Sequence, residues 1–236
     1  MNHFNNKLLS LFSLYDSIVF FDFETSGLNH IDDDIIEIGA IQLRKSDNGP
    51  LKYKELGTLV KLSKRSSLPS KITAITGITA QMLDENGINI EVAKKELYEM
   101  MTKDDKTIIV AHNALFDLSF LVELFKNQKE FFEQIDVIDT LTVFKDRRPY
   151  PHKLSDAIMQ YNLMEKVQNS HRAIDDVNSL IEVLIAMDEE KNDIIYYCNL
   201  IGYNPKYPPK PIYSMPKLKY YPHPYNMRGT LYQKIA

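Results

Sequence analysis

The 236-residue sequence predicts an α/β domain built around one mixed sheet. Three strand-like segments come first, joined by short loops, and helical and strand-like segments then alternate to about residue 188. Strands joined by short loops run antiparallel and strands joined through helices run parallel, so this order predicts three antiparallel strands plus parallel strands, flanked by helices. With 44% apolar and 25% charged residues, the composition matches an average globular protein and excludes a fibrous or wholly disordered chain.

The first three strands are expected at residues 17–24, 34–43 and 55–62. The first of them is rich in β-branched and aromatic residues and runs into Thr25-Ser26-Gly27, a turn signal. Residues 45–50 are polar and end in Asn48-Gly49-Pro50, as is typical of a hairpin loop. These strands should form the antiparallel part of the sheet.

Helices and short buried strands are expected to alternate in the rest of the domain. Apolar residues recur at helical spacing after Ala114, and Thr79 fits the N-cap of a helix. We expect strands at 107–111 and 135–138. We expect one helix that begins at residue 114, and further helices at 70–83 (broken at Gly77), 90–101, 153–161 and 171–187.

Several classes of protein are excluded by simple counts. The one cysteine, Cys198, allows neither an internal disulfide nor a zinc site with several cysteines. No apolar run approaches the roughly 18–20 residues that cross a bilayer, so no membrane partner is expected. The N-terminus lacks the pattern of a signal peptide, and we expect a cytoplasmic protein.

The net charge of −4 hides a strong asymmetry along the chain. Residues 205–236 hold six of the 28 basic residues and no acid, whereas residues 1–204 hold 22 basic and 32 acidic residues. The same tail contains seven of the 11 prolines and six of the 14 tyrosines. This composition shift predicts a boundary near residue 204. We divide the chain into a lead segment (1–16), a folded domain (17–190) and a C-terminal extension (191–236), which is basic and rich in proline and tyrosine from about residue 205 and packs as an extended strap or stays mobile.

Asp22 and Glu24 are the first candidates for chemistry. They lie two residues apart on a predicted strand, so both side chains project from one face, where the two carboxylates repel each other unless a cation lies between them. Mg²⁺ and Mn²⁺ prefer such oxygen ligands. Taken alone, the pair is also compatible with two solvated acids on a half-exposed strand.

Two further blocks contain candidate acids. Asp117 lies in the first turn of a helix that follows a buried strand, where open α/β sheets build their sites, although a helix-start aspartate is also favoured by the helix dipole. His171 and Asp175 lie four residues apart and would share one face of a helix. Asp176 we interpret as a solvated neighbour.

Together, these blocks closely resemble the DnaQ-like (DEDDh) 3′–5′ exonuclease superfamily, over about residues 17–188. Its Asp-x-Glu-Thr-Thr/Ser-Gly-Leu motif is matched from Asp22 to Leu28, and its His-Asn-Ala-x-Phe-Asp motif from His112 to Asp117. A third family block, with a histidine, an alanine and an aspartate, we align on His171, Ala173 and Asp175. Residues 35–40 and 75–79 also resemble family segments.

The resemblance implies a ribonuclease H-like fold and a two-metal phosphodiesterase. Two divalent cations, Mg²⁺ or Mn²⁺, would be held by Asp22, Glu24, Asp117 and Asp175, and His171 would be the general base. It also implies a set of contacts to the terminal nucleotides, with Ile78 wedged between the last two bases. This set comprises Thr25, Ser26, Gly27, Leu28, Ile78, Asn113 and Phe116.

We therefore expect an enzyme that releases nucleoside monophosphates from single-stranded or frayed 3′ ends of DNA. Three alternatives stay open at this point: the same chemistry on RNA, a proofreading subunit whose tail docks on a DNA polymerase or another replication or repair protein, and a binding module without catalysis.

Overall fold

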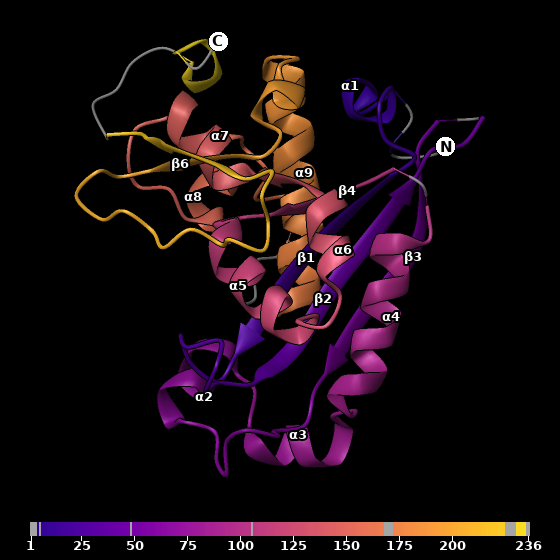
Figure 1. Ribbon diagram of the computed structural model, residues 1–236, viewed down its shortest axis with the longest axis vertical. Helices are drawn as coiled ribbons and strands as arrows, with labels where there is room; N and C mark the ends of the chain where they lie inside the picture. Colours follow the sequence, from indigo (N-terminus) through magenta and orange to yellow (C-terminus); the bar gives the residue numbers. More distant parts are fainter. Residues whose placement is uncertain are drawn as a thin grey trace.

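Five strands form the central sheet, in the order β3-β2-β1-β4-β5 (Figure 1). The computed structural model describes residues 4, 6–47, 49–104, 106–167, 172–224 and 230–234. The strands are β1 (Ser17–Thr25), β2 (Ile35–Arg44), β3 (Leu51–Leu59), β4 (Thr107–Ala111), β5 (Asp136–Asp139), β6 (Leu200–Tyr203) and β7 (Lys219–Pro222). The helices are α1 (Leu9–Phe12), α2 (Ser70–Thr76), α3 (Ala80–Asn86), α4 (Ile90–Thr102), α5 (Ala114–Leu124), α6 (Lys129–Gln134), α7 (Thr140–Arg147), α8 (Leu154–Gln160) and α9 (Ala173–Glu190), with 3₁₀ turns at Ile194–Tyr197 and Leu231–Lys234. Across these described ranges, none of the helices is long and apolar enough to cross a membrane.

The strand pairing confirms the predicted mixed sheet. β2 runs antiparallel to both β1 and β3, whereas β1, β4 and β5 run parallel to one another. The carboxyl ends of these three parallel strands therefore meet at one edge, which we call the carboxyl edge. In sheets of this kind, binding and catalytic sites form at that edge.

Side-chain alternation along β1 divides the core into two layers. Val19, Phe21 and Phe23 pack with residues of α4, α5 and α6 on one face of the sheet, whereas Ile18 and Phe20 pack with α7, α8 and α9 on the other. Figure 1 shows α4 and α9 running along the sheet. Because side chains on a strand alternate with a period of two, Asp22 and Glu24 continue the row of Ile18 and Phe20 and face α9.

The elements that differ from the sequence prediction are those with a weak apolar pattern. β3 spans Leu51–Leu59, not 55–62, because it is an edge strand whose side chains are mostly exposed. α6 and α7 were not predicted: α6 has only six residues, and α7 follows β5 directly, with Asp139 accepting from the Leu141 N–H (3.1 Å) as its N-cap. The predicted cap Thr79 is confirmed, since it accepts from the Met82 N–H at 3.1 Å.

The C-terminal extension packs on the domain as a strap, one of the two expected arrangements. β6 and β7 pair in parallel, and the Asn199 N–H donates to the Val137 carbonyl of β5 at 2.7 Å. Met215 and Leu218 are buried in the same apolar cluster as α5. The strap thus covers the outer edge of β5, which would otherwise expose unpaired backbone groups.

Candidate active site

Asp22 and Glu24 lie near the carboxyl end of β1, half-buried, on the face that α9 covers. In the pairing of β1 with β2, Asp22 is opposite Gly39 and Glu24 is opposite Glu37. Both predicted carboxylates therefore share one face, as the strand period required.

Asp117 joins this pair from α5. Its carboxylate is buried, and its Oδ1 accepts the backbone N–H of Phe23 at 3.1 Å. Phe23 lies between Asp22 and Glu24 in the chain, so this hydrogen bond holds Asp117 beside both. The position follows from the fold, because α5 begins directly after the carboxyl end of β4.

The fourth acid is Asp176, and the prediction of Asp175 is wrong. Carboxylate oxygens of Asp22, Glu24 and Asp176 all lie within 4.8 Å of one another. Asp175 instead borders a surface cavity together with Lys166, Asn178 and Glu182. Asp176 is buried, because α9 turns Ala173, Asp176 and Val177 toward the sheet.

Two signals in the sequence point to Asp176. The apolar row Ala173, Val177 and Leu180 defines the buried face of the helix, and Asp176 lies three residues after Ala173 and four before Leu180, on that same face. The family block has the spacing His-x-Ala-x-x-Asp, and counting from His171 also ends at Asp176 rather than Asp175.

Glu37 was missed by the sequence reasoning, and it fixes the start of α9. Its side chain is 2% exposed. One oxygen accepts from Arg172 Nε at 2.9 Å and Nη2 at 2.6 Å, and the other accepts the Ala173 N–H at 2.9 Å. Gly39 on the same face is required, because a Cβ there would overlap the Ala173 carbonyl. A charged residue within the apolar run 35–41 was the available signal.

His171 lies outside the described residues, so its role as general base stays a prediction. α9 begins at Ala173, not at residue 171 as expected. The structure does describe the adjoining Arg172, which Glu37 holds next to the carboxylates. The positive charge of Arg172 acts to lower the pKa of Glu24.

Burial and neighbouring negative charges raise the pKa of three of these acids, Asp22, Glu24 and Asp117. Burial, followed by the charges of Asp176 and Glu37, raises the pKa of Asp22 to about 7. Burial and the charge of Asp22 raise the pKa of Glu24 to about 8. Burial and the charge of Asp22 also raise the pKa of Asp117, although the hydrogen bond from the Phe23 N–H acts in the opposite direction.

This carboxylate cluster fits divalent metal ions. All its donors are carboxylate oxygens, which hard divalent cations prefer. Without a cation the acids hold protons to unusually high pH, as expected of like charges gathered in a partly buried place. Asp22, Glu24, Asp117 and Asp176 are therefore the residues that would hold the metal.

The turn after β1 is rigid, and its residues differ in what they offer to a substrate. The Ser26 hydroxyl is buried and accepts the Asp34 N–H at 2.8 Å, so Ser26 supports the turn. Thr25 donates to the Gly27 carbonyl at 2.7 Å, and the Asp33 side chain leaves no room for a Cβ on Gly27. Leu28 is 86% exposed, so it is the apolar side chain of residues 25–28 that solvent reaches.

Ile78 cannot act as the predicted wedge in this structure. It is 0% exposed and packs with Ile36, Leu59 and Leu83 in a separate small core cluster. α2 and α3 use this cluster to attach to the end of the sheet. The sequence pattern was compatible with Ile78 as a wedge or as a core residue. Because its side chain is buried, Ile78 is a core residue.

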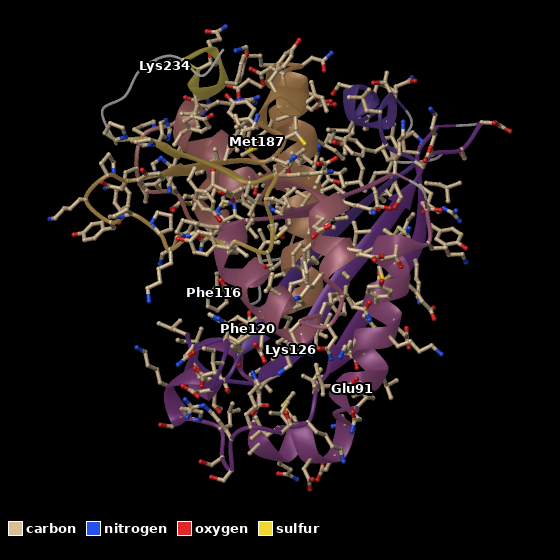
Figure 2. All side chains as sticks on the ribbon, viewed as in Figure 1. Glu91, Phe116, Phe120, Lys126, Met187 and Lys234 are labelled. Atoms are coloured by element: carbon tan, nitrogen blue, oxygen red, sulfur yellow. The ribbon has the colours of Figure 1, made fainter. Side chains whose placement is uncertain are left out.

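At the start of α5, Asn113 is exposed and Phe116 is half-buried. Asn113 has a left-handed backbone (φ 63°) at the N-cap position. Phe116 and Phe120 lie side by side, with ring centroids 5.2 Å apart (Figure 2). The neighbouring His112 is structural, since its ring nitrogens bond to Thr140 Oγ1 and the His152 carbonyl, each at 3.0 Å.

Exchanging Leu28 and Ile78 for alanine separates the two roles. We expect Leu28→Ala to leave the free energy of unfolding within about 0.5 kcal/mol of wild type, because its side chain packs on little, and to raise KM for an oligonucleotide. Ile78→Ala should cost about 2–5 kcal/mol, because it leaves a cavity in the core. Urea unfolding and steady-state kinetics measure both, and an unfolding free energy of Ile78→Ala equal to that of wild type would contradict the assignment.

Comparisons with known proteins match most of this chain. The family model RNase_T, described as exonuclease, matches residues 19–184. The PolC-type DNA polymerase III of Clostridium perfringens is 30% identical over 172 residues, which are 73% of this chain and 11% of that protein. The 3′–5′ exonuclease DinG of Staphylococcus saprophyticus is 31% identical over 173 residues, 72% of this chain and 18% of that protein.

The fold is shared with a solved structure. The zinc-bound form of the E. coli exonuclease I complex with single-stranded DNA superposes with a TM-score of 0.63 at 19% identity, covering 78% of this chain and 42% of that chain. This likeness confirms the ribonuclease H-like sheet. The chain spans less than a fifth of the curated relatives it matches. Since the family model covers most of the chain, including Asp22, Glu24, Asp117 and Asp176, the chain belongs to the exonuclease family.

Proposed function

We propose that this chain is a 3′–5′ exonuclease that hydrolyses the terminal phosphodiester bond of DNA in the presence of Mg²⁺ or Mn²⁺. The observation that carries the proposal is the convergence of Asp22, Glu24, Asp117 and Asp176 at the carboxyl edge of the sheet. The names of the DinG relative and of the exonuclease I complex support the polarity and the single-stranded DNA substrate.

Each part of the site has one task in this proposal. Leu28, Asn113 and Phe116 bind the terminal nucleotide, and His171 takes the proton of the attacking water as general base. Glu37 and Arg172 hold the start of α9, and thereby the direction in which Asp176 points. When bound, the divalent cations supply positive charge that stabilises the attacking and leaving oxygens.

The experiment uses four substrates with a 3′-terminal label: single-stranded DNA, single-stranded RNA, duplex DNA with a matched 3′ end, and duplex DNA with a mismatched 3′ end. Wild type with Mn²⁺ should release labelled mononucleotides, whereas wild type with EDTA and the Asp22→Ala variant should not. DNA should be degraded faster than RNA, and mismatched ends faster than matched ends, because a frayed end is already single-stranded. Release from the 5′ end, or binding without release, would overturn the proposal.

The PolC-type relatives support a further part of the proposal, in which the domain works next to a DNA polymerase. In that setting, the mismatched end left by a polymerase is the substrate. The expected result is that adding this chain to a polymerase without its own exonuclease lowers the frequency of misincorporation, while the Asp22→Ala variant does not.

A further inference from the structure

The segment of residues 203–213, which we call the edge strap, follows from β6, the strand that lies along the outer edge of β5. β6 runs in the same direction as β5, because Asn199 pairs with Val137 near the start of β5, and the Gly202 N–H donates to Thr142 Oγ1, just past its end, at 2.9 Å. The chain after Tyr203 thus emerges beside the carboxyl end of β5, at the carboxyl edge. Figure 1 shows this segment, in orange to yellow, curving outward beside α5.

Internal hydrogen bonds and the partly buried side chain of Ile212 hold the edge strap in place. Asn204 accepts the Lys206 N–H through its side chain at 2.9 Å and the Tyr207 N–H through its carbonyl at 2.8 Å. The Ile212 N–H donates to the Tyr220 hydroxyl at 2.9 Å, and Ile212 packs in the same cluster as residues of α5. Exposed side chains on this strap are therefore presented by an ordered backbone.

The exposed side chains of the edge strap are cationic and aromatic. Tyr207 and Tyr213 are 65% and 88% exposed, and Lys206 and Lys210 are exposed as well. Over the part of the chain that is described, neither lysine forms an ion pair with an acid, and Lys206 Nζ lies 5.3 Å from the centre of the Tyr207 ring. The sequence places no acid between 205 and 236, although residues 1–204 hold all 32 of them.

We propose that the edge strap binds the single-stranded nucleic acid whose 3′ end enters the carboxylate cluster. Lys206 and Lys210 contact backbone phosphates, and Tyr207 and Tyr213 stack on bases. This inference rests on the proposed function, which places a 3′ end at the same edge. It concerns residues beyond 19–184, the range that the family model matches.

A nucleic acid fits this surface better than a protein partner does. Lysine is depleted at the cores of protein–protein interfaces, whereas phosphates match cations that lack an acidic neighbour. Base faces stack on exposed aromatic rings without regard to sequence. The edge strap also gives this otherwise acidic chain a positively charged surface, which attracts a polyanion.

Binding of a 5′-labelled 20-nucleotide oligothymidylate in EDTA tests the proposal without turnover. The variant replaces Lys206, Tyr207, Lys210 and Tyr213 by alanine, and the control replaces Lys95 and Lys129, which are exposed on α4 and α6. We expect the fourfold variant to raise Kd at least tenfold and to reduce the slope of log Kd against log salt by about 1.4, since each phosphate contact to a single strand contributes about 0.7. The control should match wild type.

Hydrolysis of a dinucleotide should be unchanged in the fourfold variant, because a dinucleotide does not reach beyond the carboxylate cluster, while KM for the 20-mer should rise. Equal Kd and salt slope in wild type and the fourfold variant would overturn the inference, including the case in which the strap binds a protein instead. A different result would show that the proposed function is wrong: wild type would bind the oligonucleotide but release no nucleotide from its 3′ end.

Discussion

Asp176→Asn should abolish exonuclease activity, while Asp175→Asn should leave it nearly intact. Asp176 lies within 4.8 Å of the carboxylates of Asp22 and Glu24, and asparagine removes one charged ligand without changing the size of the side chain. We expect a loss of about 10³-fold or more in kcat/KM, or roughly 4 kcal/mol of transition-state stabilisation. Asp175 points to a different surface, so its variant should stay within about threefold of wild type.

The two neighbouring variants control for each other, because both change one aspartate in the first turn of α9 to its isosteric amide. Thermal unfolding should show both proteins folded, and Mn²⁺ titration should show weaker binding for Asp176→Asn alone. The opposite ranking, with Asp175→Asn inactive and Asp176→Asn active, would refute the site as described here.

In EDTA, the stability of the protein should fall as the pH rises from 5 to 8.5. The folded-state pKa of Asp22, about 7, and that of Glu24, about 8, exceed their ordinary values of 3.8 and 4.5. At these two carboxyl groups, the folded state therefore binds more protons than the unfolded state between about pH 4 and pH 8. The stabilisation is complete below pH 4, and it is lost as the pH rises through the folded-state pKa values.

Asp22→Asn should consequently stabilise the metal-free protein at pH 8.5 and change it little at pH 5. A gain of about 2 kcal/mol corresponds to a Tm increase of roughly 4–8 °C for a domain of this size. Adding Mn²⁺ at pH 8.5 should raise the Tm of wild type by mass action and that of the variant much less. Calorimetry of both proteins at both pH values, with and without Mn²⁺, measures this, and an equal Tm of both in EDTA at pH 8.5 would contradict it.

Periodicity was sufficient for the strand acids but was applied to the wrong residue on the helix. The two-residue period of β1 placed Asp22 and Glu24 on one face, as the structure has them. On α9 the same kind of reasoning, applied to the apolar row, leads to Asp176, whereas pairing His171 with Asp175 ignored which face the sheet covers. An acid on an apolar face was the more informative observation, because burying a charge requires a compensating partner.

Contacts between residues distant in the sequence could not be predicted from local pattern. Glu37 accepts hydrogen bonds from Arg172, 135 positions later in the chain, and from the Ala173 N–H, 136 positions later. The residues next to Glu37 in the sequence do not indicate these partners. Ile78 likewise became a core residue only because α2 and α3 fold onto Ile36 and Leu59. Such roles depend on which surfaces meet, and the strand order decides that.

The sequence by itself determined the mixed sheet, the order of its elements and the types of side chain available for chemistry, because alternation and turn residues act over a few positions. The tertiary structure alone decided that Glu37 fixes α9, that Ile78 belongs to the core, and that the C-terminal extension lies along β5. The physical reason is that burial and the proximity of charges are properties of packed surfaces, and these surfaces exist only once strands and helices distant in the chain have come together.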